Sequence, residues 1–143
     1  MIYSEIPITE LIPQRPPFLM VDRVLASSEE DTETVFEIRE DNILLDGERL
    51  SAAALIENMT QSCACRMGCR SVNEDKPIRI GVIGAIKNCD ITRLPVLGET
   101  LHTHVCILEE VLHLTLAHVV VKVEDETIAN SLVKIAMTDI EAK

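Results

Sequence analysis

Residues 51–70, with the sequence SAAALIENMTQSCACRMGCR, decide the fold of this chain. Ser51 is a good N-cap, and the alanines, leucine and methionines that follow are strong helix formers, so the stretch predicts one long helix. One face is expected to pack on a sheet and carries Leu55, Ile56, Met59 and Cys63. The other side is small and polar, which suits a partner or a cleft, and carries Ala53, Ala54, Glu57, Gln61, Cys65 and Gly68.

Strands are expected on both sides of this helix in the sequence. A short turn or helix at Thr9 to Ile12 ends at Pro13. Two strands are expected between this segment and the long helix, and four more after the long helix. The six expected strands are at 18–26, 32–39, 78–86, 100–109, 113–124 and 127–138. Asp125 and Glu126 form a tight turn between the last two. A lone helix that is apolar all round must be wrapped by the sheet. We therefore predict one α+β domain over residues 1–143, with a central helix inside a curved antiparallel sheet.

Composition excludes several classes of function. The chain has 143 residues, 47% hydrophobic and 26% charged, which is typical of a folded globular protein. Its net charge of -11 argues against nucleic acid and against anionic membranes as ligands. Five cysteines are an odd number, no signal peptide is visible, and no apolar stretch reaches the length of a bilayer span, so we expect a reducing, cytoplasmic compartment.

Two sequence motifs resemble one known family. Residues 13–24, PQRPPFLMVDRV, are similar to the N-terminal motif of the (3R)-hydroxyacyl-acyl-carrier-protein dehydratases of fatty acid synthesis, with Gln14 where that family usually has His. Residues 55–62, LIENMTQS, are similar to the family's helix motif, in which a catalytic Glu is followed four residues later by Gln. Residues 83–86 and 93–99 fit its later strand and turn. The resemblance implies the hotdog fold and the site residues Glu57 and Gln61.

One part of the family's site is missing from this chain. Family dehydratases carry their catalytic His in a Gly-His-Phe-Pro loop shortly before the helix, whereas residues 42–50 here, NILLDGERL, form a shorter segment without His. All four histidines follow the helix, and Ser51-Ala52 replace the family's Pro-Gly. The chain in this respect resembles the divergent dehydratase-like proteins of aryl polyene and related pigment clusters.

The residues near the helix start fit acyl-thioester chemistry. Dehydration of a 3-hydroxyacyl thioester needs a base, an acid and donors for the thioester oxygen. The free backbone N–H groups at Ser51, Ala52 and Ala53 are the candidate donors, and we expect these residues to bind substrate. Glu57 is the candidate acid, and Gln61 at i+4 is expected to bond Glu57 or the substrate hydroxyl. Because the helix is otherwise apolar, Glu57 is expected to be partly buried.

Three functions remain open from the sequence. The chain is a dehydratase-like lyase, or a half-site subunit that pairs with a His-containing dehydratase, or a hotdog thioesterase in which Glu57 activates water. The expected partner is an acyl carrier protein or an acyl-CoA thioester, and docking of an acidic carrier would need a local basic patch with four candidate residues, Arg66, Arg70, Lys87 and Arg93. No cofactor is expected.

Metal binding is the less favoured interpretation of the cysteines and histidines. Cys65 and Cys69 at i, i+4 read as small buried apolar residues, as do Cys63 and Cys106. His102 and His104 have a spacing that zinc sites use, with His118 as the third ligand, but we expect them on the outer face of the sheet.

The apolar strand over residues 78–86 predicts a dimer, in which two protomers join their sheets with the helices alongside each other. The strand over residues 100–109 should alternate between the helix side and the outside, and so should the strand over 113–124. The outer face would then be too apolar for free solvent, which predicts further stacking of dimers there.

Overall fold

The computed structural model describes residues 2–142, so Met1 and Lys143 of the predicted domain lie outside the described residues. Two short 3-10 helices come first, at Tyr3–Glu5 and Ile8–Glu10. The remaining elements are β1 (Arg23–Ser27), β2 (Asp31–Glu37), β3 (Leu45–Asp46), β4 (Arg49–Leu50), α1 (Ala52–Asn73), β5 (Arg79–Ile91), β6 (Thr100–Val111), β7 (Leu114–Val123) and β8 (Glu126–Glu141). None of the helices among these residues is both long and apolar enough to span a membrane.

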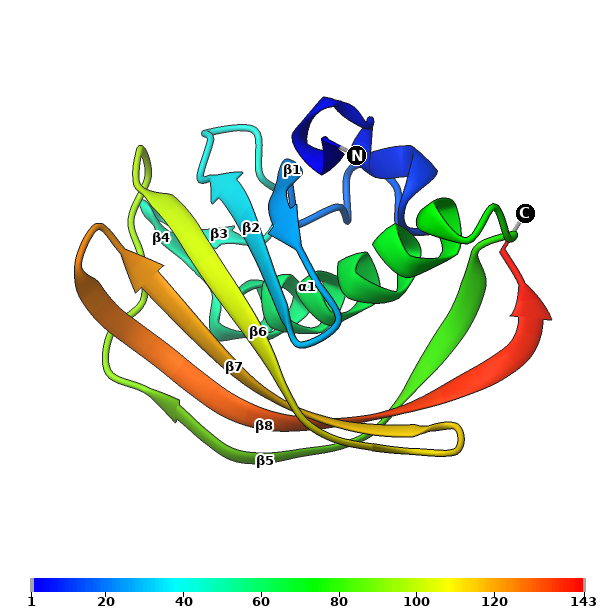
Figure 1. Ribbon diagram of the computed structural model, residues 1–143. Coiled ribbons are helices and arrows are strands. Elements are labelled where there is room, and N and C mark those ends of the chain that lie inside the picture. Colours follow the sequence, from blue (N-terminus) through cyan, green and yellow to red (C-terminus); the bar gives the residue numbers. More distant parts are fainter. Residues whose placement is uncertain (1, 143) are drawn as a thin grey trace.

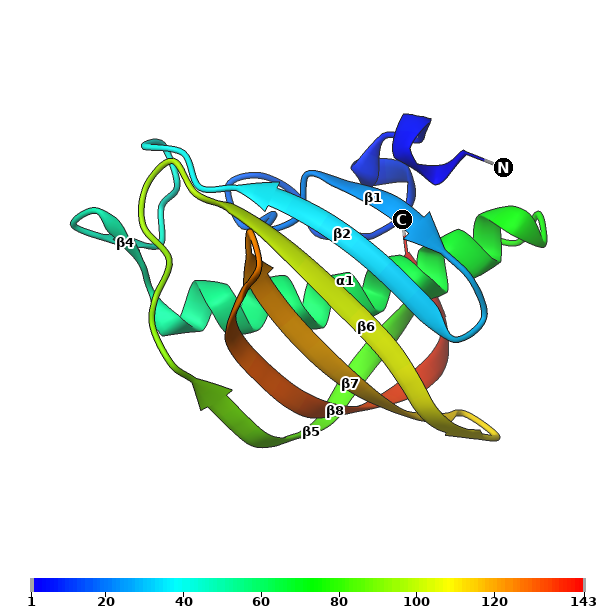
Figure 2. The ribbon, with the colours of Figure 1, turned by 60° about the vertical axis from the view of Figure 1, so that its left-hand side comes forward.

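Six of the strands form one antiparallel sheet in the order β1-β2-β6-β7-β8-β5. The sheet curves around α1, which lies along its concave side, while β3 and β4 form a separate hairpin beyond the start of the helix (Figures 1 and 2). The predicted architecture, one central helix wrapped by a curved antiparallel sheet, is confirmed. Strand β5 is the first strand after the helix, yet it lies at the sheet edge and pairs only with β8.

The core between α1 and the sheet is almost entirely aliphatic. Leu55, Met59 and Cys63 are buried there against residues of β2, β6, β7 and β8, as their spacing on the helix predicts. Ile56 is only half-buried and does not belong to this cluster, because it lies at the border of the covered face.

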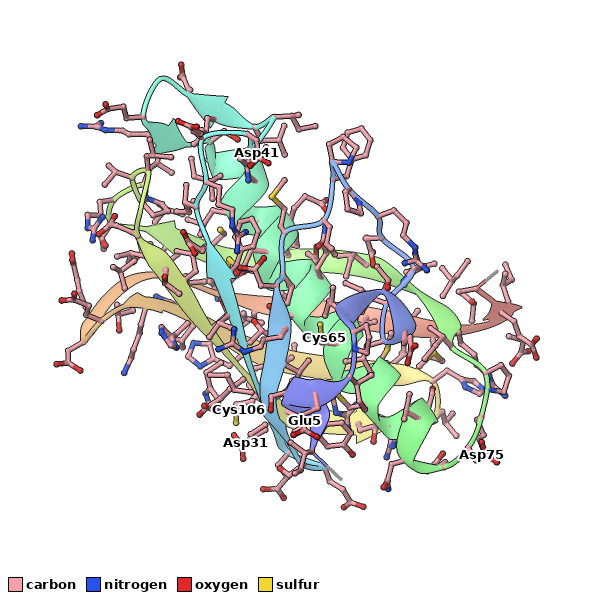
Figure 3. All side chains as sticks on the ribbon, turned by 90° about the horizontal axis from the view of Figure 1, so that it is seen from above. Glu5, Asp31, Asp41, Cys65, Asp75 and Cys106 are labelled. Atoms are coloured by element: carbon pink, nitrogen blue, oxygen red, sulfur yellow. The ribbon has the colours of Figure 1, made fainter. Side chains whose placement is uncertain are left out.

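The N-terminal segment covers the opposite side of α1, which its small and polar residues predict to face a partner or a cleft. Cys65, labelled in Figure 3, and Cys69 pack there in a second apolar cluster with Ile8, Leu11, Ile12, Val21 and Val24. The approach is so close that a Cβ atom on Gly68 would lie 1.9 Å from the Leu11 carbonyl oxygen. Only a glycine allows the backbone to pass here. The free part of this side therefore ends before Gln61.

The first predicted strand is shorter than its apolar run. Residues 18–22 belong to no strand, since Phe18 lies in a bend after Pro17 and the next four residues have no regular secondary structure, and β1 begins at Arg23. The reason is that the backbone of Phe18 and Met20 bonds to side chains of α1 and not to a neighbouring strand. Side-chain amides on a helix thus take the place of a strand partner, which strand propensity does not reveal.

Candidate functional site

The β3–β4 hairpin leads the chain directly into the start of α1. Gly47 makes the turn in the left-handed region at φ 65°, and the Ser51 N–H donates to the Leu44 carbonyl at 3.0 Å. Ser51 Oγ then accepts from the Ala54 N–H at 3.2 Å, so Ser51 is the N-cap that its sequence position predicts. Ala52 and Ala53 are exposed, and N–H groups in a first turn have no partner within the helix. The Ser51 N–H is already bonded to Leu44, so the expectation that it is a free donor is wrong, and the helix start can offer the N–H groups of Ala52 and Ala53 to a ligand.

Glu57 lies on the same exposed stripe, about one and a half turns further along the helix. Its side chain is exposed in the single chain, so the expected partial burial is wrong. Neither the N-terminal segment nor the sheet covers the Glu57 side chain. The carboxylate is nevertheless fixed, because Gln61 Nε2 donates to Glu57 Oε2 at 3.0 Å.

Gln61 is almost fully buried, with 1% of its surface exposed, and its amide makes three hydrogen bonds. Besides the bond to Glu57, Nε2 donates to the Phe18 carbonyl at 2.9 Å, and Oε1 accepts from the Met20 N–H at 2.7 Å. This geometry orients the Glu57 carboxylate and joins the helix to the N-terminal motif. Both N–H groups of the amide are occupied, so Gln61 is a positioning residue for Glu57 in this arrangement.

Asn58 is a structural residue that the sequence motifs do not single out. It is fully buried, donates from Nδ2 to the Met20 carbonyl at 2.7 Å, and accepts from Thr103 Oγ1 at 2.6 Å. Met20 is thus held by its N–H through Gln61 and by its carbonyl through Asn58. The signal was available: Asn58 and Gln61 are polar residues at i, i+3 on an apolar helix, a spacing that puts both side chains on one face.

A small cavity lies further along the helix, between α1 and the edge strand β5. Its volume is about 50 Å³, and it is lined by Gln14, Thr60, Cys63, Ala64, Met67, Gly81, Ile83 and Ile135. Thr60 follows Glu57 by one turn, so the exposed stripe of α1 leads from the helix start towards this cavity. Gln14 Oε1 is buried here without a hydrogen-bond partner among the described residues.

The single chain brings no histidine to the helix start. Residues 42–50 hold the polar side chains Asn42, Asp46, Glu48 and Arg49, and Asn42 is used in bonds to Met20 and to the Leu44 N–H. His102, His104 and His118 lie on the outer face of the sheet, and His113 lies in the turn between β6 and β7. A site built on Glu57 therefore lacks an imidazole base in this chain.

Three of the four cations proposed for carrier docking are neutralised by carboxylates. Arg66 and Arg70 each contact Glu110 Oε2 at 3.1 Å, and these guanidiniums, Arg66 first, lower the pKa of Glu110 to about 2. Arg93 contacts Glu99 at 2.9 Å and Glu126 at 3.0 Å, and its hydrogen bonds lower the pKa of Glu99. Lys87 alone of the four is exposed with no ion pair within residues 2–142.

The cysteines of the helix lie in apolar surroundings. Cys63, Cys65 and Cys69 are buried, and burial raises the pKa of Cys63 to about 12 and that of Cys69 to about 11, so these thiols stay protonated at neutral pH. Cys106 is half-buried on the outer face of the sheet. Within the described residues, no group of three or more His, Cys, Asp or Glu side chains is placed to hold a metal ion.

The fold and the helix start together define a class of protein, the hotdog proteins, in which one helix lies inside a curved antiparallel sheet. The family model described as ApeP-like, ApeP dehydratase, matches residues 6–141. The chain therefore belongs to the ApeP-like dehydratase family, as its sequence motifs predict. No curated protein is significantly similar to it in sequence.

Similar solved structures share this fold at low sequence identity. A chain of the dehydratase heterocomplex ApeI:P from Xenorhabdus doucetiae is 13% identical, has a TM-score of 0.87, and covers 94% of this chain and 92% of its own. A hypothetical thioesterase with coenzyme A from Streptococcus pneumoniae has a TM-score of 0.66 at 9% identity over 82% of this chain and 86% of its own. The PaaI protein of the E. coli phenylacetic acid degradation operon reaches 0.65 at 12% identity, covering 79% and 80%.

Proposed function

We propose that this chain binds acyl thioesters as one half of a heteromeric dehydratase that acts on carrier-protein-bound 3-hydroxyacyl chains. The observation that carries the proposal is Glu57, which is held by Gln61 on an exposed stripe beside the helix start while residues 42–50 provide no histidine. A partner that bears the histidine completes the site. The existence of a dehydratase heterocomplex among the structural relatives supports this arrangement.

The catalytic roles of the two subunits follow from the chemistry of dehydration. The partner's imidazole removes the proton on carbon 2, and Glu57 protonates the hydroxyl that leaves carbon 3 as water. The N–H groups at Ala52 and Ala53 hold the thioester oxygen while negative charge develops on it. The acyl chain follows the exposed stripe of α1 past Thr60 towards the small cavity beside β5.

The edge strand β5 is the surface on which we expect the partner to pair. Its residues are exposed or half-buried throughout, including Val82 at 51%, Ile83 at 37% and Ile86 at 39% exposure. An apolar edge strand with unpaired backbone groups is a template for a strand of another chain. Pairing there also brings the partner beside the cavity and the exposed stripe of the helix.

We assign carrier docking to the partner subunit, because this chain offers little for an acidic carrier. Its net charge is -11, and Arg66, Arg70 and Arg93 are committed to carboxylates within the chain. Like charges on two surfaces slow their association.

Dehydration of a 3-hydroxyacyl carrier protein tests the proposal. The chain alone should show no activity above background, a mixture with a His-bearing dehydratase should be active, and Glu57→Gln should lower the activity of the mixture by about 10²–10⁴-fold. Glu48→Gln, an exposed acid on the β3–β4 turn, is the matched control and should change nothing. Turnover by the chain alone contradicts the half-site arrangement, and an unaffected Glu57→Gln mixture leaves this chain a scaffold.

The second candidate is a thioesterase in which Glu57 activates water, and the exposure of Glu57 favours it because water reaches the carboxylate directly. The same assay separates the two functions when free thiol is followed beside the enoyl product. Thiol release by the chain alone that Glu57→Gln abolishes indicates hydrolysis. Enoyl product from the mixture alone indicates dehydration.

A further inference from the structure

A patch on the outer face of the sheet combines exposed apolar residues with separated charges. The strand register places three rows across β6, β7 and β8 there: Val111–Leu114–Ala136, Glu109–Leu116–Lys134 and Cys106–His118–Leu132. Leu114 is 63% and Val111 53% exposed, and a hollow of about 300 Å³ lies between them and Lys134. We call these nine residues the outer patch. It lies on the side of the sheet away from α1 and is independent of the thioester site.

The charges of this region lie on opposite sides of β7. Glu109 is on β6 and Lys134 on β8, with Leu116 between them. One row further, Asp31 lies beside Cys106 (Figure 3), and the same row ends at Lys87 on β5. Strands are about 4.8 Å apart, so Glu109 and Lys134 are separated by about 10 Å along the sheet surface. Neither residue makes an ion pair within residues 2–142.

This distribution is self-complementary under one kind of twofold axis. A twofold axis parallel to β7 that lies between two stacked patches places β6 of one copy over β8 of the other. Glu109 of each copy then faces Lys134 of the other copy. Asp31, whose Oδ1 also lies 2.8 Å from His104 Nε2 of its own chain, then faces Lys87, while His118 and Leu116 lie close to the axis. An axis across the strands would lay Glu109 over Glu109 and Lys134 over Lys134, which is unfavourable. The parallel axis also matches the aligned packing that stacked sheets usually adopt.

We propose that a second copy of this chain docks on the outer patch about a twofold axis parallel to β7. Closed symmetric contacts of this kind are the commonest among homo-oligomers. The contact ends at the next row, where Glu33 on β2 and Asp90 on β5 would face each other with like charge. It therefore involves the half of the outer face nearest the β6–β7 turn, includes Lys87 of β5, and leaves the hydrogen-bonding edge of β5 free for a different partner.

Charge exchange tests both the occupant and the axis. Glu109→Lys alone and Lys134→Glu alone should each weaken association of the full chain roughly tenfold, and the double variant should restore it. Leu116→Glu should abolish the contact. Asp125→Lys changes charge by the same amount on the exposed β7–β8 turn and should leave association unchanged. Sedimentation velocity at low and high salt measures each step, and circular dichroism verifies that every variant is folded.

Unchanged mass of Leu116→Glu overturns the proposal. A double variant that associates no more strongly than the single variants contradicts the axis parallel to β7. With an axis across the strands, residues 109 and 134 would each face their own copy, so like charges would meet in every variant. Some variants could associate with themselves as wild type does but fail to assemble with a dehydratase partner. That result would assign the outer patch to the dehydratase partner, and it would overturn the proposal that a second copy docks there. Failure of the half-site dehydration assay is a separate outcome, because it does not alter the mass of the chain alone.

Discussion

Gln61 shows how one side chain serves structure and site together. Its amide closes three hydrogen bonds in a buried position, to Glu57, Phe18 and Met20. The Met20 N–H and the Phe18 carbonyl have no strand partner, so they depend on this amide. The same group that attaches the N-terminal motif to the helix therefore also fixes the direction in which Glu57 points.

Gln61→Leu should lower the free energy of unfolding by about 1–3 kcal/mol or more, because it leaves the buried Met20 N–H without an acceptor. Urea denaturation measures the change. Glu57→Gln is the matched comparison and should stay within about 0.5 kcal/mol of wild type, since its side chain is exposed. If Gln61→Leu were as stable as wild type, the Met20 bond would carry no weight in the fold.

At the scale of elements, Glu110 connects the last turns of α1 to the end of β6. Two arginines of the helix, Arg66 and Arg70, share its carboxylate, and Thr115 of β7 donates to it at 3.2 Å. Arg66 is 5% exposed, so this ion pair is the one that removes a guanidinium from solvent. Among the described residues, loss of the carboxylate would leave Arg66 with only its bond to the Glu29 carbonyl.

The pKa of Glu110 predicts a pH dependence of stability. The folded pKa is lowered from 4.5 to about 2, so the carboxylate stabilises the fold fully above about pH 4.5 and progressively less as the pH falls towards 2. The difference in unfolding free energy between wild type and Glu110→Gln should therefore be greatest at neutral pH and shrink across that interval. Urea denaturation at a series of pH values measures it, with Glu48→Gln as the control. A difference that stays constant with pH would contradict the role of the ion pair.

The sequence predicted the elements better than their environment. Helix α1, its Ser51 cap and the five later or central strands follow from local propensity and periodicity, because these depend on neighbours in the chain. The irregular course of residues 18–22 and the exposure of Glu57 depend instead on what packs against the helix. Residues 8–24 pack against Cys65 and Gly68, about 50 positions away in sequence, and no local pattern in either segment indicates that contact.

The site was predictable only in part for the same reason. Glu57 and Gln61 were found through the motif, and their i, i+4 bond follows from helix geometry. Asn58 was missed because its partners, Met20 and Thr103, lie far away in the sequence. The neutralisation of Arg66 by Glu110 was equally out of reach, since the two residues are 44 positions apart and meet only where α1 packs on the sheet. Arg93 and Glu99 are six positions apart in the segment between β5 and β6, so this ion pair is local in sequence.

At the scale of the whole molecule, the edge strand β5 is the surface that the proposed dehydratase pairing uses. Ile86→Lys should abolish assembly with a His-bearing dehydratase while the chain stays folded, because a lysine on an edge strand opposes pairing and Ile86 is already 39% exposed. Size-exclusion chromatography of the mixture detects the loss. Ile140→Lys, at a site 62% exposed near the end of β8, is the matched control and should assemble normally. Assembly that survives Ile86→Lys places the partner elsewhere.

The sheet order also governs what happens while the chain is being made. A ribosome releases β5 before β6, β7 and β8, but the only neighbour of β5 in the sheet is β8, the last strand. From the release of Ile91 until residues 126–141 have emerged, the nascent chain carries an apolar strand with no sheet partner on either side. At about 5–20 residues per second this interval lasts a few seconds, long enough for a chaperone to bind. A premature stop within β8 would leave both β5 and β7 without their common neighbour, and such a truncated product is a substrate for cellular proteases.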